Sequence, residues 1–296
     1  MSGAPEVLVH ADGSLLAKAV AARTITGLVD ALAATGRAHL VLTGGGIGTK
    51  VLAELAAAPA RDAVDWTRVD FWWGDERFVP VGDPDRNETG ARAALLDHIS
   101  VDPARVHTMN GPDGPDGDDP EAAAARYAAE LATVASAGTV ASAGTVASAG
   151  TVASAGTVAS AGTVASAGTV ASAGTASAGT ASADGALVPA FDILMLGIGP
   201  EGHVASIFPE APAAYADGQV VSVRNSPKPP PTRISLTFGA IQAAREVWIL
   251  ASGAEKAEAV ARALAGEPED KLPAAGARGT ERTLFLLDEP AASAII

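Results

Sequence analysis

Hydrophobic residues follow two alternating patterns along this chain. Over residues 14–35, apolar side chains recur every three or four positions, which predicts one long amphipathic helix. Short continuous apolar runs predict buried strands instead, and they lie at 39–45, 68–73, 191–197, 232–238, 246–251 and 283–287. Further helices are predicted through 51–55 and at 88–99, 121–131 and 256–264.

Apolar strands that alternate with helices are typical of a parallel sheet with helices on both faces. The predicted fold class is therefore α/β, with a mostly parallel sheet. In open sheets of this kind, ligands bind outside the carboxyl ends of the strands. Functional residues are therefore expected in the segments that directly follow the predicted strands.

One segment departs from this alternation. From Thr133 to Gly174 the hexapeptide TVASAG repeats without variation, and shortened copies continue to Ala183. Each copy has one Val as its only sizeable apolar side chain, which buries too little surface to offset chain entropy, and Gly in every copy opposes a helix. We therefore predict one domain, 1–296, interrupted by a flexible low-complexity linker over 133–183. Without it about 245 residues remain, an ordinary size for one α/β domain.

Charge and composition narrow the range of partners. The chain has 20 Lys and Arg against 34 Asp and Glu, a net charge of −14, which disfavours nucleic acids and anionic membranes. An anionic ligand would therefore need a locally basic pocket. The chain has no cysteine, which excludes disulfides and thiolate chemistry. We recognise no signal peptide and no apolar run of about 20 residues, so we expect a cytoplasmic protein.

The first candidate segment is TGGGIGT, from Thr43 to Thr49, between a predicted strand and a predicted helix. Glycines let the backbone approach a ligand, and a helix N-terminus attracts an anion. The spacing fits neither a Walker A loop nor G-x-G-x-x-G, which argues against a nucleotide. The backbone of Gly44, Gly45 and Gly46 is a candidate phosphate site, although a simple tight turn would show the same glycines.

The second segment is WWGDERFVP, from Trp72 to Pro80, at the end of a predicted strand. Arg77 is suited to hold a phosphate through two parallel hydrogen bonds. Asp75 is a candidate for binding sugar hydroxyls or for supporting a catalytic group, and Asn87 downstream is a candidate helix cap. A solvated charged turn is the plainer interpretation of the same residues.

The third segment, GIGPEGHVASIFP from Gly197 to Pro209, is the most informative. His203 follows an apolar strand and a Gly-rich turn, so we expect it near the N-terminus of a helix at the carboxyl edge of the sheet. That setting disfavours the imidazolium and favours a neutral general base. Glu201 either orients this base or complements the helix dipole. A buried, hydrogen-bonded histidine is the alternative interpretation of His203.

Positive residues near strand ends are candidates for the basic pocket. Lys228 and Arg233 lie in SPKPPPTRISLT, Arg224 precedes them, and Lys256 follows a predicted strand. Of these four, Arg224 and Lys228 are interpreted as surface residues.

Taken together and in this order, these segments resemble the 6-phosphogluconolactonases over nearly the whole chain outside the repeat. The resemblance rests on the Gly-rich turn, W-x-D-E-R-x-V-P with a downstream Asn, G-x-G-x-x-G-H-x-A-S-x-F-P, the S-P-K-P-P segment and a final strand ending at Asp288. It implies a Rossmann-like domain related to glucosamine-6-phosphate deaminase and ribose-5-phosphate isomerase.

The resemblance also implies hydrolysis of 6-phosphogluconolactone in the oxidative pentose phosphate pathway, without a metal or an organic cofactor. His203 would activate water for attack on the lactone carbonyl, with Glu201 and Asp75 as further catalytic candidates. Asp75 and Asn87 would lie around the sugar. The partner would be a small sugar-phosphate lactone, and the protein a monomer or a small homo-oligomer. The implied phosphate and substrate contacts are the backbone from Gly44 to Gly46 and the side chains of Arg77, Arg233 and Lys256.

Two departures from the family pattern touch the site. Many members have Asp where this chain has Glu201, and many have Ser-Thr-Pro after the first glycines, where it has Gly46 to Thr49. Three other functions stay open: an amino-sugar-phosphate isomerase or deaminase, a non-catalytic sugar-phosphate sensor, and an interaction tether formed by the repeat. HVASIFP lacks the Asn and Glu of the deaminase pattern, and we find no helix-turn-helix segment before residue 39.

Overall fold

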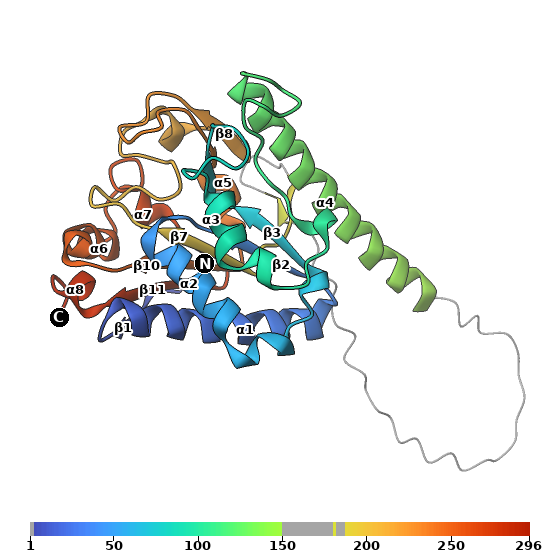
Figure 1. Ribbon diagram of the computed structural model, residues 1–296, viewed down its shortest axis with the longest axis horizontal. Coiled ribbons are helices and arrows are strands. Elements are labelled where there is room, and N and C mark those ends of the chain that lie inside the picture. Colours follow the sequence, from blue (N-terminus) through green and yellow to red (C-terminus); the bar gives the residue numbers. More distant parts are fainter. Residues whose placement is uncertain (1–2, 150–179, 182–186) are drawn as a thin grey trace, which may run out of the picture.

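Six parallel strands form the central sheet, as the computed structural model in Figure 1 shows. Their spatial order is β1-β11-β10-β7-β2-β3. This arrangement confirms the predicted α/β fold. The strands are β1 Glu6–His10, β2 Ala38–Leu42, β3 Val69–Trp73, β7 Ile193–Gly197, β10 Glu246–Ala251 and β11 Arg282–Asp288.

The structure describes residues 3–149, 180–181 and 187–296, and it describes side chains for all of these except 138–149 and 180–181. Within these ranges, no helix combines the length and the apolar composition that crossing a membrane requires. The α-helices are α1 Gly13–Thr35, α2 Gly45–Ala57, α3 Asn87–Ala94, α4 Pro120–Ala149, α5 Phe238–Gln242, α6 Ala257–Leu264, α7 Pro273–Gly276 and α8 Glu289–Ala292. Short 3-10 helices lie at Pro59–Ala63, Trp66–Arg68, Leu96–His98, Pro103–Arg105, Pro212–Tyr215 and Ala254–Lys256.

Two smaller sheets accompany the central one. Strands β4 (Asp75–Arg77), β9 (Arg233–Leu236) and β8 (Val220–Val223) form an antiparallel sheet in the order β4-β9-β8. Its register places Arg77 opposite Arg233. The strand predicted at 232–238 is therefore confirmed, but in this second sheet, where it brings two of the predicted site residues together. Strands β5 (Thr180–Ala181) and β6 (Leu187–Val188) form a short antiparallel pair.

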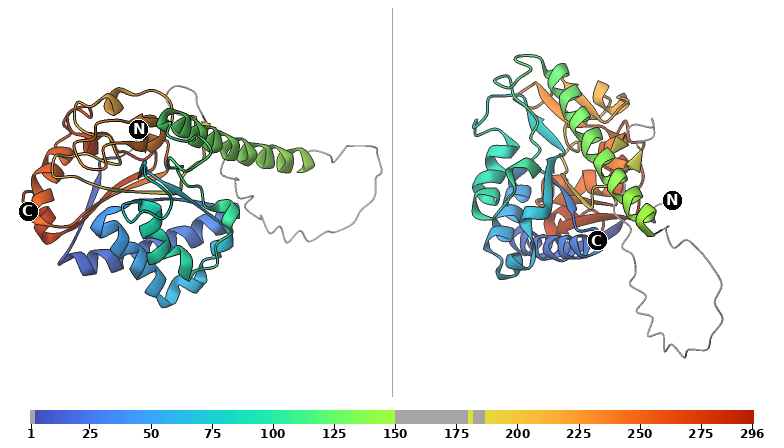
Figure 2. Two further views of the ribbon diagram at one scale, coloured as in Figure 1. Left: turned by 45° about the horizontal axis from the view of Figure 1, so that its top comes forward. Right: turned by 90° about the vertical axis from the view of Figure 1, so that its right-hand side faces the viewer.

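The central sheet separates two hydrophobic cores because successive side chains of a strand point to opposite faces. Leu40 and Leu42 pack with α1, α2 and α3, whereas Val41 between them packs on the other face with α4 to α8. Trp72 and Trp73 divide in the same way. The two helical layers are visible on either side of the sheet in Figure 2. Apart from β1, these strands are buried on both faces, which explains their continuous apolar sequences.

Two predicted helices differ from the structure. The helix predicted at 88–99 ends at Ala94, because Leu95 leaves the helical region at φ −141° and a 3-10 turn follows. The helix expected after the Gly-rich turn at Gly202 does not form, and residues 198–211 make a series of turns. Positive φ values at Gly202 (91°) and Ala205 (49°) are incompatible with a continuous right-handed helix there.

Helix α4 extends well beyond the predicted end at residue 131 and includes the first copies of the repeat, to Ala149. Val134 packs against the core and Ala135 is buried. The reason is that residues 120–131 already supply the costly helical nucleus, so an Ala-rich continuation needs only propagation. The remaining copies, and with them most of the predicted linker over 133–183, lie outside the described residues.

A buried carboxylate at the start of β3, Asp70, joins this strand to its surroundings on the side of the sheet away from the carboxyl ends. Asp70 accepts hydrogen bonds from Arg37 (2.5 and 2.6 Å), Arg105 (2.8 Å) and Nε2 of His107 (2.9 Å). Burial alone would raise the pKa of Asp70, but the hydrogen bonds from Arg37 and His107 outweigh it and hold the pKa well below its usual value. The ring of His107 also stacks on Trp72 at 3.7 Å.

We expect Asp70→Asn to lower the free energy of unfolding by about 3 kcal/mol at pH 7, because it leaves buried positive partners without their carboxylate. A lowered pKa in the folded state stabilises the fold above the unfolded pKa of about 3.9, and this contribution is lost as the pH falls below that value. Urea unfolding of both proteins at pH 7 and near pH 3 measures the difference. Asp62→Asn, at an exposed carboxylate beside Arg61, is the control and should change little.

Candidate active site

The carboxyl ends of β2, β7 and β10 open onto a cavity of about 490 Å³. The segment from 228 to 233 and strand β4 close its sides. All but one of the predicted site residues line it, and the exception, Glu201, contacts His203 directly. The predicted residues in the lining are Gly44, Gly45, Gly46, Asp75, Arg77, Asn87, His203, Arg233 and Lys256.

The imidazole of His203 is anchored on one side only. Its Nδ1 lies 3.1 Å from Oε1 of Glu201, and its ring stacks on Phe208 with 4.5 Å between centroids. In the part of the chain that the structure describes, no protein group forms a hydrogen bond with Nε2. The Glu201 carboxylate selects the tautomer with the proton on Nδ1, so Nε2 keeps its lone pair.

The turn before His203 brings the backbone unusually close to this ring. Gly199 donates its N–H to the carbonyl of His203 at 2.9 Å. A Cβ at Gly199 would overlap Nδ1 of His203 and would lie 2.6 Å from Oε2 of Glu201. Glycine at this position therefore lets the backbone, the carboxylate and the imidazole pack together.

The ring of His203 is neutral over a wide range of pH. Its pKa is lowered to about 4, first by burial and second by the ammonium of Lys228, whereas Glu201 and Asp75 act in the opposite direction. The prediction of a neutral ring near a helix N-terminus is therefore wrong in its cause, since no helix begins there. Burial and a neighbouring positive charge take the place of the helix dipole.

Asp75 connects the side of the cavity that holds His203 to the basic side. Its Oδ2 accepts a hydrogen bond of 2.6 Å from the hydroxyl of Ser206, three residues after His203. Asn87 donates its side-chain N–H to the carbonyl of Asp75 at 2.7 Å and to Oδ1 at 3.3 Å. These contacts hold the two segments, which are far apart in the sequence, in one arrangement.

The expected capping role of Asn87 is not what the structure shows. Asn87 is the first residue of α3, and its Oδ1 accepts a hydrogen bond from Nη1 of Arg77. Buried Glu76 supplies the cap instead, because its two carboxylate oxygens accept the backbone N–H groups of Asn87 (2.7 Å) and Glu88 (2.9 Å). The Asp-Glu-Arg triplet is thus a built part of the site and not a solvated turn.

The Gly-rich turn forms the end of the cavity where an anion fits best. Gly44 precedes α2 and lines the cavity, and no side chain among the described residues caps this helix, so its first N–H groups lack a side-chain partner. A Cβ at Gly44 would lie 3.1 Å from Nη1 of Arg77, so the guanidinium stands directly beside the turn. Lys50, one turn into α2, also lines the cavity.

The remaining cations have different surroundings. Lys256 lines the cavity, and its pKa is lowered, chiefly by burial. Arg233 also lines it, but its guanidinium donates to the carbonyls of Lys228 (3.0 Å), Pro229 (3.2 Å) and Pro230 (3.1 Å). The predicted phosphate contact at Arg233 therefore has most of its donors occupied by the loop that it holds.

Sequence reasoning missed several lining residues, among them Lys228, Lys50 and Ser252. Lys228 was interpreted as a surface residue, but it lies in the cavity, whereas Arg224 is exposed and paired with Glu121, as expected. Lys50 is four residues after Gly46, a helical spacing that places both on one face. Ser252 directly follows β10, which is the position where functional residues were expected.

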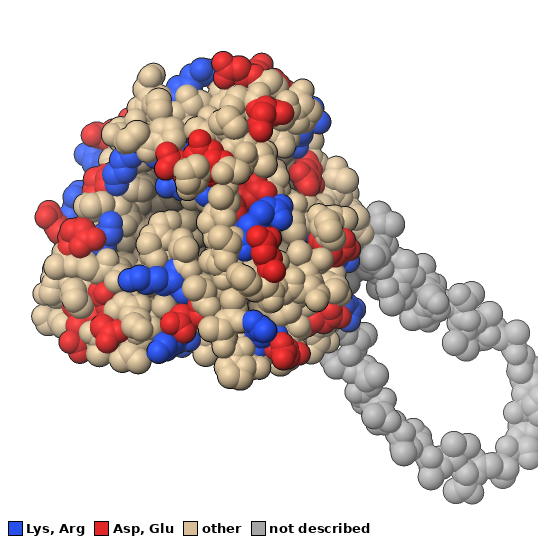
Figure 3. All heavy atoms as spheres, in the orientation of Figure 1, with Lys and Arg blue, Asp and Glu red and all other residues tan. Residues whose placement is uncertain are grey.

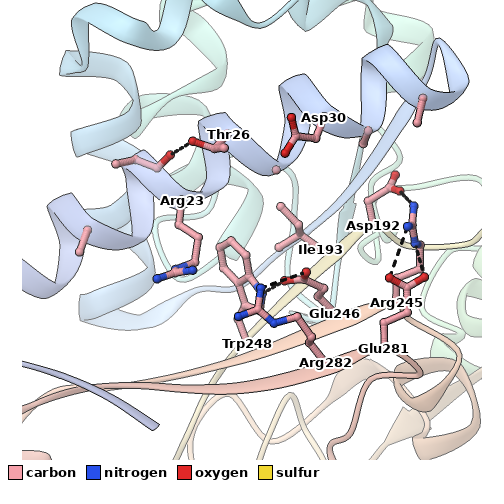
Figure 4. A pocket seen from close by; sticks show the side chains of 15 residues that line it. Arg23, Thr26, Asp30, Asp192, Ile193, Arg245, Glu246, Trp248, Glu281 and Arg282 are labelled. Atoms are coloured by element: carbon pink, nitrogen blue, oxygen red, sulfur yellow. Dashed lines mark hydrogen bonds and ion pairs between the residues drawn. The ribbon is translucent and has the colours of Figure 1, made fainter. Parts of the chain in front are cut away.

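A larger hollow of about 620 Å³ lies at the opposite edge of the sheet, between α1 and the starts of β7, β10 and β11. Figure 4 shows Arg245 turned toward Asp192 and Glu281. Arg245 pairs with Glu281 (2.8 Å) and Asp192 (3.2 Å), and the indole of Trp248 donates to Glu246 (2.7 Å). We assign the chemistry to the smaller cavity, where basic groups converge and where Nε2 of His203 has no hydrogen-bond partner among the described residues.

Acidic and basic side chains are intermixed over the face shown in Figure 3. The gathering of Lys50, Arg77, Lys228 and Lys256 around one cavity is therefore a local feature in a chain of net charge −14. Among the described residues, no three acidic or histidine side chains are placed to hold a metal ion.

A protein-family model described as "Glucosamine-6-phosphate isomerases/6-phosphogluconolactonase" matches residues 11–286. The chain belongs to this family. The match includes every residue that lines the cavity.

Individual members of the family are similar over the full length of the chain. The chain is 50% identical over 294 residues to the 6-phosphogluconolactonase of Streptomyces coelicolor, covering 99% of this chain and 95% of that protein. It is 41% identical over 290 residues to the 6-phosphogluconolactonase of Mycobacterium leprae, covering 98% of each. The solved structure of 6-phosphogluconolactonase from Trypanosoma brucei superposes with a TM-score of 0.68 at 25% identity and covers 100% of both chains.

Proposed function

We propose that this protein hydrolyses 6-phospho-D-glucono-1,5-lactone to 6-phosphogluconate in the oxidative pentose phosphate pathway, and that it does so in the cytoplasm. One observation carries the proposal. A neutral imidazole, anchored through Nδ1, lies in a cavity whose other side is a glycine-rich helix N-terminus with basic side chains. The substrate has the matching pair of features, an ester carbonyl and a phosphate. The 50% identity to a 6-phosphogluconolactonase supports the choice of lactone.

In the mechanism that we propose, Nε2 of His203 accepts a proton from a water molecule while the water oxygen bonds to the lactone carbonyl carbon. The tetrahedral intermediate then breaks its bond to the ring oxygen, and Nε2 donates to this oxygen the proton that it took from water. The carboxylic acid product ionises, and His203 returns to its neutral form. The Glu201 carboxylate on Nδ1 stabilises the transient imidazolium.

The basic side of the cavity supplies orientation. A phosphate at the start of α2 would face backbone N–H groups together with Arg77 and Lys50. This binding energy holds the lactone carbonyl near His203, which reduces the entropy cost of the reaction.

The direct test is to generate the lactone in situ from glucose 6-phosphate and to follow its loss with and without this protein. Saturable acceleration at micromolar enzyme supports the proposal. A folded protein that leaves the spontaneous rate unchanged refutes it. Glucosamine 6-phosphate is assayed in parallel, and release of ammonia from it would indicate the deaminase activity of the same fold instead.

We expect Arg77→Met to raise KM for the lactone about 10- to 100-fold with a smaller effect on kcat, because a charge-assisted hydrogen bond contributes about 1.5–3 kcal/mol. Steady-state kinetics measures both constants. Arg262→Met is the matched control, since Arg262 lies on α6 and pairs with Glu267 outside the cavity. A fall in kcat at unchanged KM would place Arg77 at the reacting carbon and not at the phosphate.

A further inference from the structure

Three side chains that differ in charge meet at one corner of the cavity. The ammonium of Lys228 lies 3.0 Å from Oε1 and 3.1 Å from Oε2 of Glu201, and 3.5 Å from Nδ1 of His203. Oε1 of Glu201 is itself 3.1 Å from Nδ1. The three groups therefore form a close triangle, and the carboxylate contacts both the ammonium and the imidazole.

We propose that Lys228 is a positioning residue for the base: it fixes the carboxylate of Glu201 against Nδ1 of His203 and keeps the imidazole neutral, with Nε2 as the accepting nitrogen. The arrangement of the three groups is present in the protein without substrate. The inference rests on the proposed function only where it says that this arrangement serves catalysis. Lys228 acts through His203 and not on the phosphate.

The backbone around Lys228 is held in place, as a positioning role requires. Ser226 donates its N–H to the carbonyl of Pro231 at 2.9 Å, and its hydroxyl accepts the N–H of Lys228 at 3.3 Å. The guanidinium of Arg233 donates to the carbonyl of Lys228 at 3.0 Å. Arg233 is buried, so this loop is fastened to the second sheet from inside the protein.

Apart from Lys228, the charged groups around His203 do not explain why its ring is neutral. Asp75 on β4 and Glu201 both favour the imidazolium, whereas burial and Lys228 oppose it. Arg233 lies farther away, with its guanidinium carbon 6.0 Å from the centre of the Phe208 ring that stacks on His203. Lys228 is therefore the cation that balances the two nearby carboxylates.

The same arrangement accounts for glutamate at position 201, where many family members have aspartate. Glutamate has one methylene more, and here its carboxylate contacts both the Lys228 ammonium and Nδ1 of His203. The pKa of Glu201 is lowered: burial acts to raise it, but backbone hydrogen bonding, Lys228 and His203 together outweigh burial. An ionised carboxylate and an ammonium then form a pair that leaves the imidazole uncharged.

The experiment is an NMR titration of the histidine side chains in the full-length protein without substrate. This choice avoids the substrate phosphate, whose own ionisation near pH 6 would distort a rate profile. The His203 signals are assigned by their loss in His203→Asn, and the nitrogen shifts distinguish the protonated from the unprotonated ring nitrogen. The buried His39 and His107 report the fold in the same spectra.

We expect the wild-type midpoint for His203 at about 4 and a rise of about one pH unit in Lys228→Met, because a like charge within about 4–6 Å is removed. Lys228→Arg should keep the low midpoint, and Glu201→Gln should not raise it. Lys18→Met, on the exposed face of α1, is the matched control and should leave the midpoint unchanged.

A Lys228→Met protein with the wild-type midpoint would overturn the proposal. A rise of the same size in Lys18→Met would overturn it too, since the effect would then belong to net charge alone. The titration is independent of catalysis. A protein that titrates as expected but does not hydrolyse the lactone would refute the proposed function and leave this inference standing.

Discussion

Replacing His203 with Asn is expected to lower kcat for the lactone by about 10²- to 10⁴-fold, the usual contribution of a general base. Asparagine is similar in size and retains a polar group toward Glu201, but its amide cannot take a proton from water. The phosphate contacts lie on the other side of the cavity, so KM should change little. The loss of lactone generated in situ measures kcat, and circular dichroism checks the fold.

His98→Asn is the control for this substitution. His98 is exposed and lies in a 3-10 turn outside the cavity, so its replacement should leave kcat unchanged. If His203→Asn hydrolysed the lactone at the wild-type rate, water activation would have to come from another group, and Asp75 would be the next candidate.

Gly199→Ala is expected to lower kcat about 100-fold without removing any catalytic atom. The new methyl group would overlap Nδ1 of His203 and approach Oε2 of Glu201 to 2.6 Å, so the ring or the backbone has to move. A displacement of about 1 Å at a reacting group costs about 100-fold in rate. The histidine NMR signals should shift in the same variant, which separates displacement of the ring from unfolding.

Gly90→Ala is the matched control, because a Cβ at Gly90 in α3 meets only Oγ1 of Thr49 at 4.0 Å. It should retain full activity and gain slightly in stability, since alanine favours the helix by about 1 kcal/mol over glycine. Full activity in Gly199→Ala would show that the observed packing of His203 is not required for catalysis.

Most of the central sheet was predictable because its strands are buried on both faces. Continuous apolar runs such as 191–197 and 246–251 have few other interpretations in an α/β protein. Strand β1 was not predicted. It lies at the sheet edge, has β11 as its one neighbour among the described strands, and leaves Val7 and Val9 exposed, so its pattern resembles a surface segment.

The candidate site was predictable where the residues directly follow strands. His203 and the Gly-rich turn are examples, because a parallel sheet brings its carboxyl ends to one edge. Lys228 was not predictable in this way. Its place depends on a loop that Arg233 fastens from a different sheet, and no local pattern in the sequence encodes that long-range contact.

The sequence alone also did not predict why His203 is neutral. The sequence Gly-Pro-Glu-Gly-His after a strand suggests the start of a helix, but positive φ values at Gly202 and Ala205 make a turn instead. The charge environment of His203 then depends on Lys228, which is 25 residues away in the chain. The local sequence therefore predicted a neutral His203 ring, but for the wrong physical reason.

The junction between α4 and the repeat bears on how this gene can change. The packed residues Val134 and Ala135 belong to a TVASAG unit that every later full copy reproduces letter for letter. If replication slippage adds or removes whole units, the unit that follows Leu131 still supplies the same valine and alanine to the core. Natural strains of different repeat length should therefore keep the same valine and alanine packed at this junction.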